Sequence, residues 1–183
     1  MSGESLQLRV RRKLGQWADR GRNLLARWFG RTPPVERPQR IVFVCRGNIC
    51  RSSFAEGWVR RHWPHIETAS AGVHVRHANP APDAAIEAAQ RLGIDLREHR
   101  SKSIQSLPQV DRTLYIVFEP WHAEDEAMRA RPDAAGTFEL GAWNRPRRAI
   151  IQDPYGRDVA TFISCYRQIV AALERLMGRW NDG

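Results

Sequence analysis

The chain of 183 residues has only three cysteines and no apolar run long enough to cross a membrane. A transmembrane helix needs roughly 20 consecutive apolar residues, so the sequence argues against an integral membrane protein. Three cysteines cannot build a disulfide-dense secreted scaffold, and the N-terminus lacks the continuous apolar core of a signal peptide. We therefore expect one folded domain in a reducing, cytoplasmic setting.

Acidic residues are scarce near the N-terminus, and this scarcity accounts for most of the net charge of +9. Residues 1–40 contain 10 Lys and Arg but 3 Asp and Glu, a net charge of +7, whereas residues 41–183 contain 19 and 17, a net charge of +2. A basic protein often binds nucleic acid, but here the main body is nearly neutral. We therefore predict no nucleic-acid partner.

The basic segment is amphipathic and is followed by a proline-rich linker. Within residues 6–29, Leu, Val and Trp recur at spacings that favour one face of a helix, and most of the arginines lie off that face. We divide the chain into an N-terminal extension with its linker, residues 1–38, and a domain, residues 39–183. Such a helix favours an anionic membrane surface, which predicts peripheral membrane association. The alternatives are a helix that packs on its own domain or on a partner, and a frayed tail.

Strand and helix patterns alternate along the domain, and the sequence contains no internal repeat. Strands are predicted at 41–45, 66–71 and 113–118, and the fourth at 137–140 or, alternatively, at 149–151; helices are predicted at 52–62, 82–92, 119–131 and 159–180. Repeated strand–helix units indicate an α/β fold in which a parallel sheet is covered on both faces. We expect three layers, with four parallel strands between helices.

A phosphate-binding loop is predicted directly after the first strand. Cys45 ends that strand, Gly47 and Asn48 lie in the loop, and a helix begins near Ser52. This arrangement turns backbone N–H groups inward at the positive end of a helix, where they bind anions, and the planar guanidinium of Arg51 matches phosphate oxygens. A thiol in that field ionises below its free pKa of about 8.5 and becomes a nucleophile. The alternative is a buried structural cysteine.

A thiolate that attacks a phosphate ester also needs a proton donor for the leaving oxygen. Asp153 is the candidate, because it follows the apolar stretch 149–151 and begins a Pro- and Gly-containing turn. Taken alone, an Asp-Pro pair commonly starts an ordinary turn.

Taken together, these motifs resemble the low-molecular-weight protein tyrosine phosphatase family. The matching segments are 44–52 (VCRGNICRS), 55–56 (AE), 70–72 (SAG), 93–96 (GIDL), 99–101 (HRS) and 153–156 (DPYG). The resemblance extends over residues 40–180, and it implies a four-stranded parallel sheet with flanking helices and no metal or organic cofactor.

The resemblance also implies roles for individual residues. Cys45 is the nucleophile that becomes phosphocysteine, Arg51 holds the phosphoryl group, and Asp153 is the general acid and then the base that activates water. Ser52 stabilises the thiolate.

Further residues are implied to support the loop. Asn48 maintains its strained shape through a network with Ser70 and His99, and Cys50 matches a second cysteine that can form a reversible disulfide with the nucleophile. A small buried side chain is the alternative role for Cys50.

Several positions depart from the family pattern and concern substrate selection. Arg46 is charged where the loop is usually uncharged, and Arg46 with Arg76 predicts a rim that favours an acidic peptide. Ile49 is the residue of tyrosine-type members, whereas members that act on phosphoarginine have Thr there. Tyr155 is expected to stack on the substrate ring or, alternatively, to pack the acid loop.

The function predicted from these residues is hydrolysis of phosphotyrosine proteins. Residues 141–143 are similar to bacterial members that oppose the tyrosine kinases of exopolysaccharide synthesis. One alternative is an arsenate reductase of the same fold, which needs further thiols as a relay, but Cys165 is expected in the core. Another is a membrane- or partner-binding adaptor with a vestigial site.

The six histidines lack zinc-site spacing, so we predict no metal. The sequence gives no indication of the oligomeric state.

Overall fold

The structure, a computed structural model, describes residues 37–131 and 134–181. The stretch 6–29, for which we predict an amphipathic helix, lies outside the described residues. Within the described part, no helix combines the length and the apolar character needed to cross a membrane.

The centre of the domain is a parallel sheet of four strands in the order β2-β1-β3-β4. The strands are β1 (Arg40–Cys45), β2 (Glu67–Gly72), β3 (Thr113–Val117) and β4 (Ala134–Glu139). The predicted four-stranded parallel sheet is thus confirmed, and the fourth strand is the first of the two alternatives, since 149–151 forms no strand. The chain moves from β1 outward to β2 and then returns to β3 on the other side, so the strand order reverses at β1. In such sheets a crevice for ligands opens at the carboxyl ends of the strands beside that reversal.

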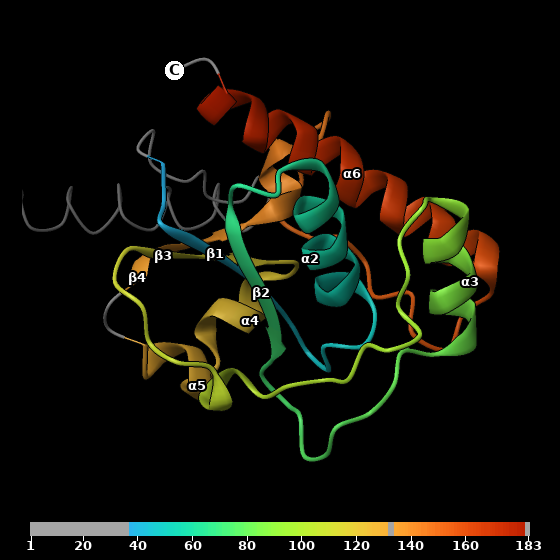
Figure 1. Ribbon diagram of the computed structural model, residues 1–183, viewed down its shortest axis with the longest axis horizontal. Coiled ribbons are helices and arrows are strands. Elements are labelled where there is room, and N and C mark those ends of the chain that lie inside the picture. Colours follow the sequence, from blue (N-terminus) through green and yellow to red (C-terminus); the bar gives the residue numbers. More distant parts are fainter. Residues whose placement is uncertain (1–36, 132–133, 182–183) are drawn as a thin grey trace, which may run out of the picture.

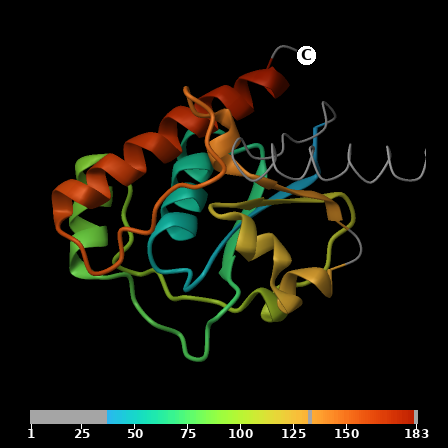
Figure 2. The same ribbon diagram turned by 180° about the vertical axis from the view of Figure 1, so that it is seen from behind.

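Helices cover both faces of this sheet. They are α2 (Arg51–His62), α3 (Asp83–Arg91), α4 (Pro120–Glu124), α5 (Glu126–Arg129) and α6 (Val159–Asn181), with short 3-10 turns η1 (Ile104–Ser106) and η2 (Leu140–Trp143). The long helix α6 extends along the outside of α2 and α3, whereas α4 and α5 lie on the opposite side of the sheet (Figures 1 and 2). The fold is therefore the predicted three-layer α/β arrangement.

The alternation of side chains along β1 explains why both faces must be covered. Ile41 and Phe43 belong to the core under α2, α3 and α6, and Val42 and Val44 belong to the smaller core under α4 and α5. Successive strand residues point to opposite faces, so an entirely apolar strand is stable only between two layers. Its end is therefore held rigidly, and Cys45 is its last residue.

The single helix predicted over 119–131 is wrong, because the chain there forms two short helices. Asp125 separates α4 from α5 in an extended conformation (φ −63°, ψ 143°), and its carboxylate accepts a hydrogen bond from the backbone N–H of Ala127 at 3.0 Å. An aspartate in this N-cap role starts a new helix, which competes with continuation of the old one. The apolar pattern alone did not reveal this break.

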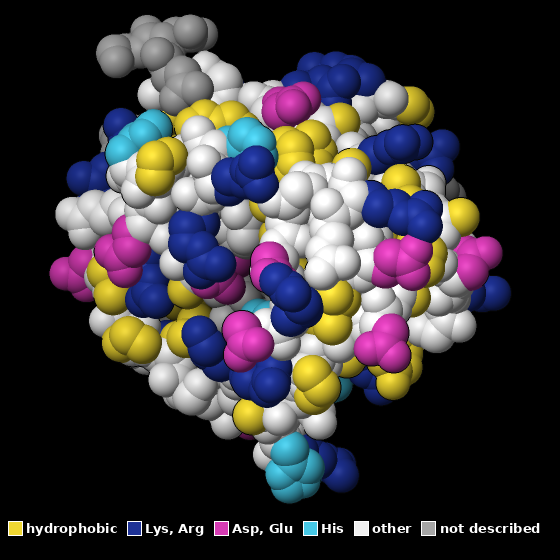
Figure 3. Space-filling view, turned by 45° about the vertical axis from the view of Figure 1, so that its right-hand side comes forward, with side chains coloured by type: hydrophobic (Ala, Val, Ile, Leu, Met, Phe, Trp, Pro, Cys, Tyr) yellow, Lys and Arg dark blue, Asp and Glu magenta, His cyan; other side chains and the backbone are white. Residues whose placement is uncertain are grey.

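The surface of the domain mixes both signs of charge. On the face shown in Figure 3, Lys and Arg side chains are interspersed with Asp and Glu and form no continuous basic patch. This face lacks the basic stripe that usually marks a nucleic-acid interface.

Candidate active site

The nucleophile candidate lies at the carboxyl end of β1, where the loop 46–50 leads into α2. Cys45 is 3% exposed, and its Sγ accepts a hydrogen bond from the backbone N–H of Asn48 at 3.3 Å. The Oγ of Ser52, in the first turn of α2, lies 3.1 Å from the same sulfur. Both donors would stabilise a thiolate at this position. Since the loop ends at the N-terminus of a twelve-residue helix, the helix dipole also favours negative charge there.

Asn48 sets the shape of the loop from its centre. It is fully buried with φ at +54°, a left-handed conformation that asparagine tolerates better than most residues. Its Nδ2 donates to the Oγ of Ser52 at 2.9 Å and to the Oγ of Ser70 at 2.8 Å. Ser70 in turn donates to the carboxylate of Glu56 at 2.6 Å. The network therefore ties the loop to α2 and to β2.

Two further contacts hold Asn48 from the segment before η1. The backbone N–H of Lys102 donates to Asn48 Oδ1 at 2.9 Å, and His99 Nε2 lies 2.6 Å from the backbone oxygen of Asn48. Burial lowers the pKa of His99, although its bond to Asn48 opposes that shift. A carbonyl oxygen only accepts, so Nε2 carries the hydrogen and the ring can remain neutral. The structure thus brings together Asn48, Ser70 and His99 in the predicted network.

Gly72 allows the loop to approach β2. A Cβ at this position would lie 2.7 Å from the backbone oxygen of Arg46 and 2.9 Å from the backbone nitrogen of Asn48. Because both neighbours are backbone atoms of the phosphate-binding loop, a larger residue would displace that loop.

Arg51 is almost completely buried and is held by several acceptors. It is 1% exposed, and its Nη1 donates to Glu119 Oε1 at 2.7 Å and to the backbone oxygen of Ile151 at 2.8 Å. Its Nη2 forms an ion pair with Asp153 Oδ2 at 2.8 Å. Its Nε is buried and has no hydrogen-bond partner among the described residues, so this N–H is available to a phosphoryl oxygen. A planar guanidinium oriented in this way suits a tetrahedral phosphate.

Glu119 is a site residue that the sequence reasoning missed. Besides accepting from Arg51, it accepts a hydrogen bond from Trp121 Nε1 at 3.1 Å, so its carboxylate orients the guanidinium. The signal was its position: it follows β3 at the carboxyl edge of the sheet, beside β1, where α/β proteins place their ligand sites.

The acid candidate lies on an exposed turn. The stretch before it is anchored because the N–H of Ile151 donates to the backbone oxygen of Phe118 at 2.9 Å. Asp153 is 36% exposed at its side chain, and its Oδ1 accepts from the N–H of Tyr155 at 3.3 Å. Tyr155 itself is 64% exposed, and its ring is open to solvent.

The loop and the turn enclose one pocket of about 330 Å³. It is lined by Cys45, Arg46, Gly47, Ile49, Cys50, His74, Asp153 and Tyr155. The nucleophile and the acid candidate thus share one cavity. Arg46 lines its rim as predicted, but Arg76, which is exposed, is not among the lining residues. His74 takes that place, and the sequence reasoning gave it no role.

The other two cysteines are unlike Cys45. Burial raises the pKa of the Cys50 thiol above its ordinary value, and the neighbouring Cys45 adds to that shift. Burial also raises the pKa of Cys165 to about 12. Cys165 is 5% exposed on α6, which confirms the prediction that it belongs to the core. Neither thiol ionises readily near neutral pH, so neither competes as a nucleophile.

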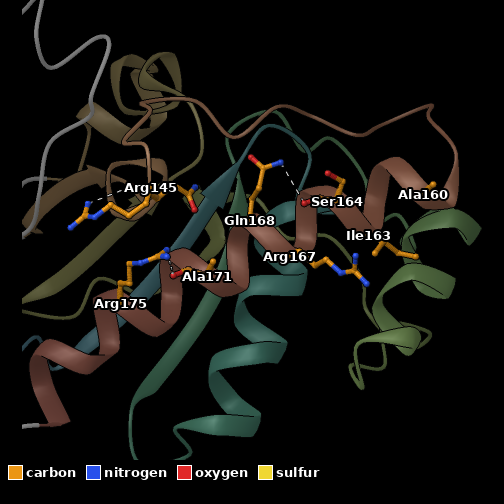
Figure 4. A pocket seen from close by; sticks show the side chains of 9 residues that line it. Arg145, Ala160, Ile163, Ser164, Arg167, Gln168, Ala171 and Arg175 are labelled. Atoms are coloured by element: carbon orange, nitrogen blue, oxygen red, sulfur yellow. Dashed lines mark hydrogen bonds between the residues drawn. The ribbon is translucent and has the colours of Figure 1, made fainter.

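A larger hollow, about 610 Å³, lies on the outer face of α6 beside the turn at Asn144. Figure 4 shows Arg145 and Arg175 at one end, Ala160 at the other, and the hydrogen bond from Gln168 to Ser164 between them. No cysteine, histidine or carboxylate lines this hollow, so it lacks the acid–base groups and the activated nucleophile that ester hydrolysis requires. Among residues 37–131 and 134–181, no three His, Cys, Asp or Glu side chains gather where they could hold a metal ion.

A buried thiol in an anion-binding loop, an oriented arginine and a nearby carboxylate define the class of cysteine-dependent phosphatases. A family profile described as low molecular weight phosphotyrosine protein phosphatase matches residues 40–182. The chain belongs to this family, and it is a protein-tyrosine phosphatase.

Individual relatives agree with this assignment. The phosphatase Ptp of Acinetobacter johnsonii is 34% identical over 125 residues, which are 67% of this chain and 84% of the relative. The structure of Vibrio vulnificus Wzb in complex with benzylphosphonate superimposes with a TM-score of 0.64 at 30% identity, over 78% of this chain and 99% of that one. The YwlE arginine phosphatase from Geobacillus stearothermophilus, at 24% identity and a TM-score of 0.63 over 79% and 94% of the two chains, shares the fold.

Proposed function

We propose that this protein hydrolyses phosphotyrosine in proteins through a phosphocysteine formed at Cys45. The observation that carries the proposal is the convergence of Cys45 and Asp153 on one pocket, while Arg51 is ion-paired to Asp153 at 2.8 Å. Nucleophile, phosphate-binding cation and acid are therefore within reach of one phosphoryl group.

In the first step the thiolate of Cys45 attacks phosphorus. The S–P bond forms, the bond between phosphorus and the tyrosine oxygen breaks, and protonated Asp153 gives its proton to the leaving oxygen. Arg51 and the N–H groups of the loop 46–50 bind the equatorial oxygens, where negative charge is concentrated in the transition state. The ion pair between Arg51 and Asp153 must loosen as phosphate takes the guanidinium, which frees the carboxyl group for this step.

In the second step water replaces the sulfur. The carboxylate of Asp153 takes a proton from the water, the new P–O bond forms and the S–P bond breaks, which releases phosphate. Ser52 Oγ and the N–H of Asn48 then stabilise the departing thiolate, because they lie 3.1 and 3.3 Å from Sγ. Asn48, Ser70 and His99 hold the loop in place, and Cys50 lies beside the nucleophile as a redox partner.

The lining of the pocket favours an aromatic ester. Cys45 is buried at its base, whereas Ile49 is half-buried and Tyr155 is exposed along its wall. The flat ring of a phenyl phosphate suits a pocket with these side chains along its wall. Tyr155 can stack on the substrate ring, and Ile49 leaves little room for a branched guanidinium. An arsenate-reductase relay is disfavoured because the raised pKa of Cys165 leaves no ready thiolate to continue it.

The family resemblance of residues 141–143 extends the proposal to a bacterial tyrosine kinase of exopolysaccharide synthesis as the opposing enzyme.

We further propose a cytoplasmic enzyme that associates peripherally with anionic membrane through residues 6–29. Charge supports this, since residues 1–40 hold a net +7. Full-length protein should co-sediment with anionic liposomes, and a chain that starts at Pro38 should not; equal recovery of both would contradict the tether.

The test of the activity is a panel of phosphopeptides that carry phosphotyrosine, phosphoserine or phosphoarginine. The full chain should release phosphate from the phosphotyrosine peptide at least about a hundredfold faster than from the others, and Cys45→Ser should release none. Turnover by Cys45→Ser would contradict the mechanism, and preference for phosphoarginine would contradict the substrate class.

A further inference from the structure

The break between α4 and α5 positions a carboxylate at the edge of the catalytic pocket. Asp125 uses Oδ1 to cap α5 through the N–H of Ala127, at 3.0 Å. Its Oδ2 lies 2.9 Å from Nε2 of His74, which comes from the loop after β2. The side chain of Asp125 is 15% exposed and that of His74 is 54% exposed, so the pair lies at the border between the protein and solvent. No residue of α4, α5 or Asp125 lines the pocket itself, so this layer reaches the rim only through His74.

His74 is held in place from three sides. Its backbone N–H donates to the carbonyl oxygen of Arg46 at 2.9 Å, its Nε2 binds Asp125, and its ring lies 5.8 Å from the ring of Trp121. Despite these attachments its side chain is 54% exposed and lines the pocket. A ring that is fixed and still open to solvent is ready to contact a ligand.

The side chains at the rim offer hydrogen-bond donors, so they suit a ligand group that accepts hydrogen bonds. A carboxylate only accepts hydrogen bonds, so Nε2 of His74 carries a hydrogen, and Nδ1 makes no hydrogen bond within the described residues. When Nδ1 is protonated, it becomes a second donor and the ring becomes a cation. Arg46 is exposed beside it, and its side chain has no ion pair in the described part of the chain. The neighbouring carboxylate of Glu119 is paired with Arg51, and so is that of Asp153 until the phosphoryl group enters.

We propose that Arg46 and His74 form a subsite for an acidic residue next to the phosphotyrosine, with Asp125 as the positioning residue of His74. This inference rests on the proposed function, because it names the substrate class of the same pocket. The flanking carboxylate binds Arg46 and Nδ1 of His74 while the phosphoryl group occupies the loop 46–50. It takes no part in the bond changes, so its contribution appears in KM more than in kcat.

The experiment compares two peptides that differ only by Glu or Gln beside the phosphotyrosine. Full-length protein is assayed with both peptides at the same pH and ionic strength, so that only the flanking residue differs. The wild-type chain should prefer the Glu peptide by about fivefold in kcat/KM, the size expected of a solvent-exposed ion pair. The ratio between the peptides is taken within each variant, so changes in overall activity cancel.

The variants separate the parts of the subsite. His74→Gln keeps a donor toward Asp125 but lacks the outer one, and Arg46→Gln lacks the charge; each should bring the ratio to within about twofold of unity. Asp125→Asn keeps an N-cap for α5 and should also lower the ratio, because His74 is no longer fixed by a charge. The matched control is His65→Gln, an exposed histidine before the amino end of β2, which should keep the wild-type ratio.

Two results would overturn the subsite: a wild-type ratio near unity, or variants of His74 and Arg46 that keep the wild-type ratio. A wild-type ratio in Asp125→Asn would overturn its positioning role. If the wild-type chain released phosphate from neither peptide, the proposed function would fail, and the subsite with it.

Discussion

The two halves of the catalytic pocket are built in opposite ways. The loop half is buried and held by hydrogen bonds: Asn48 and Ser52 have no exposed surface, and Arg51 has 1%. The turn half is exposed: Asp153 is held by its ion pair with Arg51 and by a local turn, and Tyr155 is 64% exposed. The rigid half suits charge stabilisation, which works best when donors are oriented in advance. The open half suits entry of substrate and movement of a proton.

The largest effect should come from the sulfur at the centre of the rigid half. Cys45→Ser should abolish turnover while the fold remains, since a serine hydroxyl lacks a ready anion at this position. Cys165→Ser, a buried cysteine on α6, should keep activity to within about threefold because it touches no reacting atom. Phosphate release and melting curves measure both variants; equal loss in both would mean that packing, and not chemistry, decides.

The next largest effect should come from the acid in the open half. Asp153→Asn should lower kcat on a phosphotyrosine peptide by about 10²- to 10⁴-fold, the usual range for a general acid. The loss should be smaller on p-nitrophenyl phosphate, because its leaving group is a weaker base and needs less protonation. Steady-state kinetics on both substrates check this; the same loss on both would argue against proton donation.

A pair of variants at Asn48 tests whether conformation or bonding makes the loop rigid. Both Asn48→Gly and Asn48→Ala lose the bonds to Ser52 and Ser70 and should lower kcat by about tenfold to a hundredfold. Alanine is strained at a φ of +54° and glycine is not. The free energy of unfolding of Asn48→Ala should therefore be about 1 kcal/mol lower than that of Asn48→Gly. Urea unfolding gives the difference; equal stability would show that the backbone there is unstrained.

Tyr155 should matter little for stability and modestly for binding. Because the ring is open to solvent, Tyr155→Ala should change the free energy of unfolding by less than about 0.5 kcal/mol. KM for a phosphotyrosine peptide should rise by about fivefold, since stacking contributes roughly 1 kcal/mol. Tyr155→Phe is the matched control and should keep KM. A destabilised Tyr155→Ala would instead indicate that the ring packs the acid turn.

The smallest effect concerns the pH dependence of the free energy of unfolding, to which the buried His122 contributes. Burial, with Arg51 as the next cause, lowers the pKa of His122 from 6.5 to about 3. The unfolded chain takes up this proton near pH 6.5 but the folded chain does not until about pH 3, so stability falls as the pH is lowered between these values. Urea midpoints at pH 7, 6 and 5 should fall more steeply for wild type than for His122→Gln. His65→Gln, at an exposed site, should keep the wild-type slope.

Much of the site was predictable because its parts are close in sequence. Cys45, Asn48, Arg51 and Ser52 lie within eight residues at a strand-to-helix turn, and local geometry alone directs them to one anion. Asp153 was a candidate from its own turn and gained specificity through the family resemblance, whereas Ser70 and His99 were reached only through that resemblance, since nothing local connects them with the loop. Glu119 and His74 escaped both routes: their relevance depends on distances across the sheet.

The three cysteines show which properties follow from the local sequence and which depend on the folded structure. The amino-acid sequence is enough to predict that Cys45 ends an apolar strand before a glycine-containing turn, because strand periodicity and turn chemistry are local properties of the chain. The core position of Cys165 was also predicted, but the raised pKa values of Cys50 and Cys165 depend on how tightly the folded layers bury both thiols. The same holds for the break at Asp125. A capping bond competed there with helix continuation, and the fold placed the freed carboxylate oxygen 2.9 Å from His74.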